Sequence, residues 1–415
     1  MIGISKLYCG TVEPGDVLRY GRDSRRLPSH LLQFAADKKP VVVWNATRRC
    51  NLRCVHCYSS SADRRYRGEL TGPEARAMLD DLAAFGVPVV LFSGGEPLLR
   101  PDLLELVGYA VGRGMRAVLS TNGTLISRAG ADQLGSIGLS YVGVSLDGMR
   151  EVNDRFRGVP GAFDQAMEGI RNAQEAGLKV GLRFTITRRN AAEVPKLFDL
   201  VRERNIPRIC FYHLVYAGRG TKLMEEDLDH AATRRLVDLI INRTAALHAA
   251  GCPAEVLTVD NHCDGPYLYL RMLREKNPRA DAVLRLLRMN GGNSSGIGLG
   301  CVSWDGAVHP DQFWRHATLG NVRERPFSAI WTDASNPLLA ALRDRRPLLK
   351  GRCARAGLVA LTNGNFRVRA EAAAGDLWAC DPACYLTDEE IDLVDSKVRE
   401  QELKDAAAAA AKGGE

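Results

Sequence analysis

The feature that most constrains the fold is a regular alternation of apolar runs and helical patterns between residues 40 and 222. Each run is rich in β-branched residues, ends in glycine or a polar turn, and is followed by helical periodicity. This alternation predicts parallel strands joined by right-handed helical crossovers, an α/β fold. Six such units fit a partial barrel better than a closed barrel of eight. The predicted strands are 41–47, 87–94, 115–120, 141–147, 179–187 and 208–215.

The remaining segments differ in character, and they divide the chain around this core. Residues 1–39 form an irregular, Arg-rich lead-in, and residues 223–300 are expected to be a helical connecting region. Residues 301–390 have few helical periods, scattered Cys and His, and several turns, which indicates a smaller, loop-rich C-terminal domain. Residues 391–415 are predicted to form a final helix and a low-complexity, Ala-rich tail.

Composition excludes several classes of protein. Hydrophobic residues make up 46% and charged residues 25%, as in folded globular domains. No apolar run reaches the length of a membrane span, and the N-terminus has no apolar export segment, so we expect a cytoplasmic protein without membrane contact. The net charge of +7 comes without long basic runs, which favours an acidic small molecule over nucleic acid as partner.

Three cysteines, Cys50, Cys54 and Cys57, directly follow the first predicted strand. Clustered cysteines in a chain without an export signal point to metal binding rather than to disulfides. Three thiolates on one loop suit an iron–sulfur cluster with one iron left open. His56 lies between two of the cysteines, where its side chain is not expected to point the same way. A zinc site or three unrelated thiols are the alternatives.

This CxxxCxxC loop resembles the signature of the radical S-adenosylmethionine (SAM) superfamily, and His56 fits the aromatic or His position before the third cysteine. The resemblance implies that the three cysteines hold a [4Fe-4S] cluster whose open iron binds SAM. One electron, from a donor such as a flavodoxin or ferredoxin, then cleaves SAM to a 5′-deoxyadenosyl radical, which abstracts a substrate hydrogen. It also implies a partial (β/α)6 barrel with a smaller extension of the SPASM or twitch type.

Motifs at the ends of later strands resemble the SAM pocket of the same superfamily. The glycines of the Ser-Gly-Gly-Glu-Pro segment after the second strand let backbone approach a ligand closely. Ordinary turns are the alternative for this segment and for the Asn-Gly pair after the third strand. A supporting position behind the pocket is the alternative for the polar residues of the fourth and fifth strands. The SAM-binding candidates are Gly94, Gly95, Glu96, Asn122, Ser145 and Arg183.

Longer segments, among them VVVWNATRRCNLRCVHCYSSSAD and DPACYLTDEEI, resemble the NirJ family of heme d1 biosynthesis over residues 40–390. This resemblance implies removal of propionate side chains from 12,18-didecarboxysiroheme. A heme-synthase-like decarboxylase of iron-coproporphyrin is the alternative within the same chemistry, and SPASM-type peptide-modifying enzymes are more distant. A non-catalytic tetrapyrrole carrier or an iron–sulfur sensor is the alternative from another class.

An iron tetrapyrrole rich in carboxylates would give the positive charge of the chain a purpose. Arg219, Arg315 and Arg323 are candidates for holding its carboxylates. His309 and His316 are the catalytic candidates, because an imidazole can approach the substrate iron or protonate an intermediate. Solvated surface side chains are the alternative interpretation of all five residues.

The C-terminal region departs from the auxiliary-cluster motif of the family, which is CxxC, five residues, Cys, and a distant Cys. Cys353 and Cys384 occupy the first and last positions, whereas Ala356 and Thr362 occupy the middle ones and offer no thiolate. A second [4Fe-4S] cluster is therefore lost, rebuilt from other cysteines, or altered in its ligands. The candidate ligands are Cys301, Cys353, Cys380 and Cys384, and the cysteines interpreted as core or incidental are Cys9, Cys210, Cys252 and Cys263.

Overall fold

The computed structural model describes residues 1–11 and 39–412, with side chains described up to residue 407. Contacts divide the chain into two units. The barrel unit contains Ala36–Asp227 and Ser295–Asp344, and the accessory unit contains Met1–Ala35, Leu228–Ser294 and Arg345–Glu415. Most of the lead-in predicted over residues 1–39, and the last three residues of the tail, lie outside the described residues.

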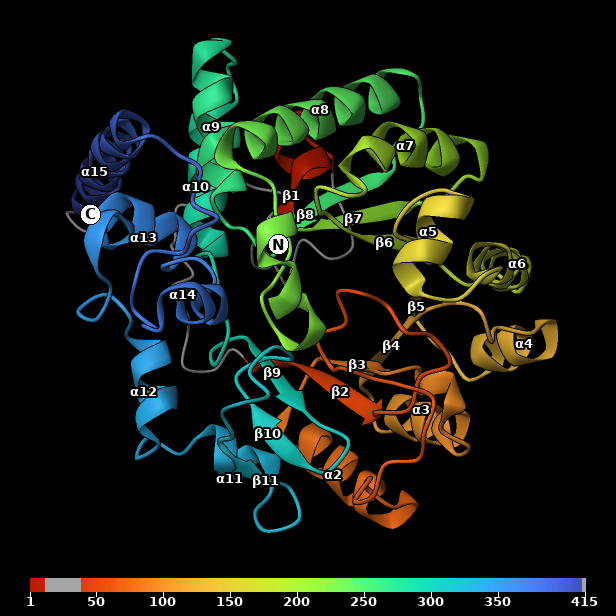
Figure 1. The fold of residues 1–415 in the computed structure, drawn as a ribbon. Helices are drawn as coiled ribbons and strands as arrows, with labels where there is room; N and C mark the ends of the chain where they lie inside the picture. Colours follow the sequence, from red (N-terminus) through yellow and green to blue (C-terminus); the bar gives the residue numbers. More distant parts are fainter. Residues whose placement is uncertain (12–38, 413–415) are drawn as a thin grey trace. The chain divides into compact units, whose positions relative to one another are not determined.

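The barrel unit is built on the parallel sheet that the sequence predicts, and every one of the six predicted strands is present (Figure 1). The strand order is β7-β6-β5-β4-β3-β2-β9-β10-β11. Strands β2 to β7 and β9 pair in parallel, whereas β10 is antiparallel to β9 and β11. The strands are β2 (Val41–Thr47), β3 (Val89–Gly94), β4 (Arg116–Thr121), β5 (Tyr141–Ser145), β6 (Val180–Thr185), β7 (Arg208–Tyr212), β9 (Leu299–Val302), β10 (Ala307–His309) and β11 (Gly320–Asn321).

Helices connect the parallel strands, as right-handed crossovers require. The first, α2, begins with a capping box, in which Thr71 Oγ1 accepts from Glu74 N at 3.4 Å and Glu74 Oε2 accepts from Thr71 N at 2.7 Å. The helices of this unit are α2 (Gly72–Phe85), α3 (Leu103–Gly112), α4 (Arg128–Ser136), α5 (Arg150–Arg157), α6 (Ala162–Glu175), α7 (Val194–Glu203), α11 (Phe327–Trp331) and α12 (Pro337–Arg343), with the short 3-10 turns η2 (Pro97–Leu99), η3 (Ala191–Glu193) and η4 (Gly218–Glu226).

Strand β9 extends the parallel sheet beyond the six predicted units. It pairs with β2, with Cys301 opposite Val43, and places residues 295–344 in the barrel unit. The segment 301–390, expected as one domain, is therefore divided between the two units. Nothing local in the sequence predicts this, because a short strand acquires its partner from tertiary contacts.

The accessory unit combines a short antiparallel strand pair with helices. Strand β1 (Ile2–Gly3) pairs with β8 (Glu255–Val259). Helix α8 (His230–Ala249) begins at the N-cap residue Asp229, whose Oδ1 accepts from Ala232 N at 2.7 Å. Within the helical region predicted over residues 223–300, this long helix therefore starts only after Asp229. The other elements are the π-helical turn η1 (Ser5–Cys9), α9 (Asp264–Arg274), α10 (Ala280–Asn290), the 3-10 turn η5 (Gly351–Ala354), α13 (Ala356–Thr362), α14 (Arg367–Ala374) and α15 (Asp388–Lys412).

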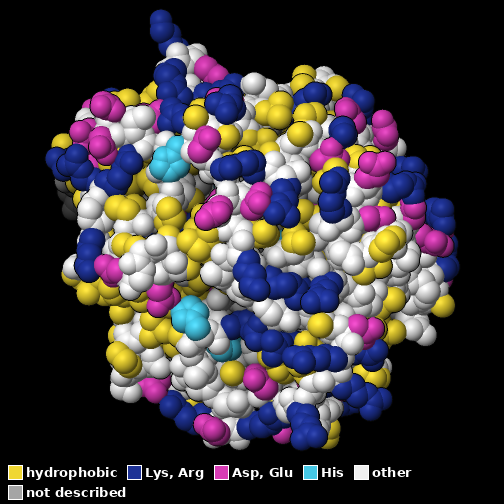
Figure 2. Space-filling model, in the orientation of Figure 1, with side chains coloured by type: hydrophobic (Ala, Val, Ile, Leu, Met, Phe, Trp, Pro, Cys, Tyr) yellow, Lys and Arg dark blue, Asp and Glu magenta, His cyan; other side chains and the backbone are white. Residues whose placement is uncertain are grey.

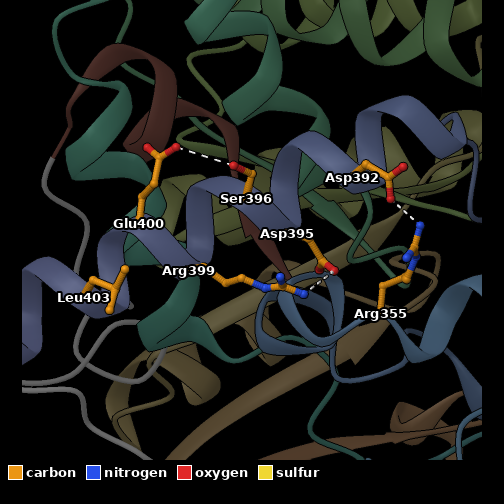
Figure 3. A pocket seen from close by; sticks show the side chains of 7 residues that line it. All are labelled: Arg355, Asp392, Asp395, Ser396, Arg399, Glu400 and Leu403. Atoms are coloured by element: carbon orange, nitrogen blue, oxygen red, sulfur yellow. Dashed lines mark hydrogen bonds and ion pairs between the residues drawn. The ribbon is translucent and has the colours of Figure 1, made fainter.

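A surface hollow lies along α15 in the accessory unit (Figure 3). Its charged side chains are paired with one another, Arg399 with Asp395 at 3.9 Å and Arg355 with Asp392. These ion pairs identify a charged helix surface rather than a reactive site. Among the helices of residues 1–11 and 39–412, none combines the length and apolar character needed to cross a membrane.

Candidate active site

The three-cysteine loop begins just after β2, at the carboxyl edge of the parallel sheet, where reactive centres of such folds lie. Backbone hydrogen bonds attach the loop to the end of α5. Arg53 N donates to Arg157 O and Val55 N donates to Phe156 O, each at 3.0 Å. These two bonds therefore fix the loop against the end of α5.

Two of the three thiols are buried, and the third is half-buried. Cys50 is 6% exposed, Cys54 is 8% exposed and Cys57 is half-buried, and all are free. Burial, with the nearby Cys54 as a lesser contributor, raises the pKa of Cys50 to about 12. A bound group of positive charge would convert such thiols to thiolates. The donor set therefore fits an iron–sulfur cluster, which brings that charge.

The arrangement differs from a mononuclear metal site. Within the described residues, no group of three His, Cys, Asp or Glu side chains is placed to hold a single metal ion. A cluster of several irons needs thiolates that surround a larger volume.

Hydrogen-bond donors surround the sulfur atoms. Leu52 N lies 3.4 Å and Asn122 Nδ2 lies 3.9 Å from Cys50 Sγ. Arg157 Nη1 donates to Cys54 Sγ at 3.5 Å. Donors of this kind set the reduction potential of an iron–sulfur cluster and stabilise its thiolates. Sequence reasoning missed Arg157, because it lies 103 residues from Cys54 and belongs to no local motif.

Arg157 is itself fixed by a buried carboxylate. Its Nη2 lies 2.5 Å from Asp147 Oδ2, and Asp147 Oδ1 accepts from Thr185 N at 2.8 Å. His56 Nε2 lies 3.7 Å from the same Oδ2, and its ring packs on Phe156 with centroids 4.8 Å apart. Burial lowers the pKa of His56 to about 4, so its imidazole is neutral at pH 7. The His56 ring is therefore engaged with Asp147 and Phe156.

At Gly94 and Gly95, the end of β3 lies in close contact with the backbone of residues 47–49. Gly95 N donates to Thr47 O and Glu96 N donates to Arg49 O, each at 2.8 Å. A Cβ at Gly94 would lie 2.3 Å from Thr47 O, and one at Gly95 would lie 2.2 Å from Arg49 O. These positions require glycine because the end of β3 packs on the residues that lead into Cys50.

Glu96 joins the ends of neighbouring strands. Its buried carboxylate accepts from Asn122 N and from Thr121 Oγ1, each at 2.8 Å. Burial outweighs these bonds and raises the pKa of Glu96 to about 7. The remaining SAM candidates follow on the next strands: Asn122 Nδ2 donates to Asn51 Oδ1 at 2.8 Å, and Ser145 of β5 lies opposite Arg183 of β6.

The Arg183 guanidinium lies between a hydroxyl group and an aromatic ring. It donates to Ser120 Oγ, and its guanidinium lies 4.9 Å from the ring centroid of Tyr212. The structure therefore places the six SAM candidates on β3, β5 and β6 or directly after β3 and β4, at adjacent positions in the sheet order.

Two arginines predicted to hold carboxylates are engaged with protein groups instead. Arg219 Nε donates to Cys54 O and its Nη1 to Ser61 O, each at 2.8 Å, so Arg219 fixes the cysteine loop. Arg323 Nε forms an ion pair with Glu74 Oε1 at 2.7 Å. Both guanidinium groups serve the structure of the barrel unit.

The histidine candidates also differ in their surroundings. His309 is buried, with Nδ1 2.8 Å from Ala317 O and Nε2 3.0 Å from Ser303 Oγ. Both ring nitrogens are thus occupied by protein partners, and burial lowers the pKa of His309. His316 is exposed and stacks on Trp314, with centroids 5.7 Å apart.

Arg315 is the predicted arginine that lies in a cationic cluster. Its guanidinium lies 4.7 Å from the ring centroid of Trp304, and the Arg48 guanidinium lies 5.0 Å from that centroid and 4.7 Å from that of Tyr66. Burial and the charge of Arg48 lower the pKa of Arg315. Arg48 Nε and Tyr66 Oη are buried without a hydrogen-bond partner in the described chain. This cluster therefore offers donors and positive charge to an anion.

Sequence reasoning missed Arg48, although its position two residues before Cys50 was a signal. Figure 2 shows Lys and Arg side chains gathered over the region where Figure 1 places β2, β9 and β10 of the barrel unit. Gathered positive charge of this kind attracts anions.

The four C-terminal candidates do not share one unit. Cys301 is buried in β9 of the barrel unit, where Asn45 Nδ2 donates to its Sγ at 3.5 Å. Cys353, Cys380 and Cys384 belong to the accessory unit. The ligand set predicted with Cys301 is therefore not assembled within either unit.

Comparisons with known proteins show the family to which the chain belongs. The family model of the radical SAM superfamily matches residues 44–201, from β2 to α7. The chain is 66% identical over 394 residues to the Fe-coproporphyrin III synthase of Methanosarcina barkeri, covering 94% of this chain and 99% of that protein. It is 47% identical to the pre-heme d1 synthase of Dinoroseobacter shibae, covering 84% and 87%.

A solved structure of Streptococcus suis SuiB bound to its precursor peptide SuiA shares the fold, with a TM-score of 0.68 at 20% identity, covering 84% of this chain and 76% of that one. The predicted radical SAM barrel with a C-terminal extension is thereby confirmed. The extent and identity of these matches show that the chain belongs to the radical SAM superfamily, whose enzymes use a [4Fe-4S] cluster and SAM.

Proposed function

We propose that this radical SAM enzyme acts on an iron tetrapyrrole and forms an iron-coproporphyrin by removing side chains from a modified siroheme. The observation that carries the proposal is the 66% identity to an Fe-coproporphyrin III synthase over nearly the whole of both chains. Formation of pre-heme d1 is the second candidate, supported by the 47% identity to a pre-heme d1 synthase. The iron-coproporphyrin chemistry is thus better supported than the heme d1 role implied by the sequence motifs.

When bound, the cluster and SAM supply a 5′-deoxyadenosyl radical that takes a hydrogen atom from the substrate. Cys50, Cys54 and Cys57 would hold the cluster, because they lie on one loop at the carboxyl edge of the sheet. Arg157 donates to a sulfur of this loop, and Asp147 holds Arg157 in place. These buried groups keep the thiolates oriented and exclude water from them.

The SAM pocket would follow the strand ends beside this loop. Gly94 and Gly95 fix the approach of β3 to the loop, while Asn122 presents its amide next to Cys50. Ser145 and Arg183 lie opposite each other in the next pair of strands. The amide and hydroxyl groups would suit the ribose of SAM, and the guanidinium group would suit its carboxylate.

Substrate carboxylates would bind at Arg48 and Arg315. Their mutual repulsion and the unpartnered donors of Arg48 and Tyr66 are relieved when an anion binds. Arg315 also donates to Ser59 O in the segment after Cys57, so an anion held here would lie beside the cysteine loop. The indole of Trp304 offers an apolar face in the same cluster.

The test is turnover of defined tetrapyrroles by the anaerobically reconstituted enzyme with SAM and dithionite. We expect 12,18-didecarboxysiroheme to be converted to iron-coproporphyrin III, identified by mass spectrometry, together with 5′-deoxyadenosine. A product with the mass of pre-heme d1 would support the second candidate. Conversion of supplied iron-coproporphyrin III to heme, with 12,18-didecarboxysiroheme untouched, would contradict the proposal.

Two controls separate chemistry from binding. A variant with Ala at Cys50, Cys54 and Cys57 should release no 5′-deoxyadenosine; if it does, the cluster is not held by this loop. Arg315→Gln should raise KM for the tetrapyrrole about tenfold or more, as loss of a charged hydrogen bond does. Arg325→Gln is the matched control, because Arg325 is exposed and paired with Asp333, and its KM should be unchanged.

A further inference from the structure

Four cysteines of the accessory unit lie together, and they are not the four that the sequence singles out. The Cys263 side chain interacts with that of Cys384, Cys384 with Cys353, and Cys353 with Cys380. Cys353 N donates to Cys380 Sγ at 3.3 Å. Cys263, which the sequence places among incidental cysteines, therefore belongs to a connected group of four thiols.

The four thiols come from separate segments that are fixed to one another. The Asn261 side chain donates to Ala383 O at 2.9 Å, which joins the Cys263 segment to the Cys384 segment. Asn365 Nδ2 donates to Asn261 Oδ1 at 2.8 Å and lies 3.6 Å from Cys263 Sγ. Lys350 N donates to Trp378 O at 3.0 Å, which joins the segments of Cys353 and Cys380.

A buried ion pair stabilises the loop between Cys380 and Cys384. Arg369 Nε and Nη2 bond both oxygens of Asp381, at 2.8 and 2.9 Å, and both side chains are fully buried. Asp381 O then accepts from Cys384 N at 3.0 Å. This buried ion pair therefore fixes the loop that carries Cys380 and Cys384, and neither cysteine forms a disulfide.

The family positions cannot supply this group. Ala356 has no thiol, and Thr362 is buried with its hydroxyl donating to Leu358 O at 2.8 Å inside α13. Positions 356 and 362 provide no thiol, but Cys263 and Cys380 lie near Cys353 and Cys384 and each provides one. The number of thiols is thereby restored to four.

We infer that Cys263, Cys353, Cys380 and Cys384 hold a second [4Fe-4S] cluster within the accessory unit. Soft thiolates select iron–sulfur clusters or zinc, and the chain belongs to a superfamily whose enzymes use [4Fe-4S] clusters. The buried Arg367 guanidinium interacts with Cys353 and Cys380 and supplies positive charge near the thiolates. Amide donors from Cys353 N and Asn365 reach the sulfurs, as they do around iron–sulfur clusters.

Four protein thiolates leave no iron with an open position. This centre therefore cannot bind SAM as the first one does. Its role is to stabilise the accessory unit or to carry electrons. Such a centre would form whichever tetrapyrrole the enzyme takes as substrate.

The test is iron and sulfide per chain, with electron paramagnetic resonance after reduction, on the full-length protein purified anaerobically without added iron. The background is a variant with Ala at Cys50, Cys54 and Cys57. We expect about four irons per chain in this background. Addition of Cys263→Ala should reduce the iron below about one per chain and abolish the signal. Cys252→Ala, in the same unit but outside the group, should keep both.

Cys380→Ala provides a second variant, because Cys380 is only half-buried and its removal disturbs the core least. It should also lose the iron while the circular dichroism of the helices persists. Four irons retained in both the Cys263 and Cys380 variants would overturn the ligand set. One zinc and no iron in the background variant would overturn the cluster, and so would a chain without bound metal.

Discussion

Arg157 and Asp147 offer the sharpest test of how the barrel unit stabilises its cysteine loop. Their side chains are 7% and 0% exposed, and their nearest atoms are 2.5 Å apart. With charge centres about 4 Å apart and an effective dielectric constant of about 20, the attraction is about 4 kcal/mol. Removal of one partner leaves the other charge buried, which typically costs about 3–5 kcal/mol.

We therefore expect Arg157→Met to lower the free energy of unfolding of the barrel unit by about 3–5 kcal/mol. Asp147→Asn should cost less, because Arg157 keeps its bond to Cys54 Sγ. The double variant should cost clearly less than the sum of the two, with a coupling energy of about 2 kcal/mol or more. The pair, not either residue alone, would then be the stabilising unit.

The assay is urea unfolding of the anaerobically prepared protein, followed by circular dichroism, with iron per chain measured on every variant. A constant m value across the four proteins makes their midpoints comparable. Additivity of the two single substitutions within about 0.5 kcal/mol would refute the reasoning. A loss of iron in Arg157→Met that Asp147→Asn does not share would show that the bond to Cys54 matters separately.

Three further predictions follow from backbone and capping contacts. Gly95→Ala should reduce bound iron to less than half that of the parent, because its Cβ would lie 2.2 Å from Arg49 O, whereas Gly112→Ala, with open space at its Cβ, should keep full iron. Thr71→Ala should lower the free energy of unfolding by about 1 kcal/mol, as measured by urea midpoint, since α2 loses its capping box. The Glu74 carboxylate has a pKa lowered to about 2 by its bonds to Arg323 and Thr71, so its contribution is present above about pH 4.5 and is lost as the pH falls toward 2. The melting temperatures of parent and Glu74→Gln should therefore converge over that interval, and a constant difference would contradict the assignment.

The parallel core could be predicted because its signals are local. Each of the six strands is a short β-branched run, and the periodicity of the intervening helices is read from neighbouring residues. The capping box at Thr71 is likewise a local pattern, confirmed by its two hydrogen bonds. The three cysteines could be assigned because eight residues contain them all.

The supporting residues could not be predicted, because they are distant in the chain. Arg157 reaches Cys54 from α5, and Asp147 reaches Arg157 from the end of β5. Cys263 joins Cys384 across 121 residues, and only folding brings those segments together. His309 was a catalytic candidate, but its ring nitrogens bond to Ser303 Oγ and Ala317 O. Bonds of this kind cannot be predicted from the sequence.

The pairing of β9 with β2 has a consequence for synthesis of the chain. Strand β2 ends at Thr47, but its second partner begins only at Leu299. At roughly 5–20 residues per second, about 10–50 s pass between the appearance of the two strands. Throughout this interval the strand that leads into the cysteine loop has an unpaired edge, which is a template for association with other chains. A nascent barrel unit therefore needs protection, and the time before its edge closes is also the time in which iron and sulfide can reach the loop.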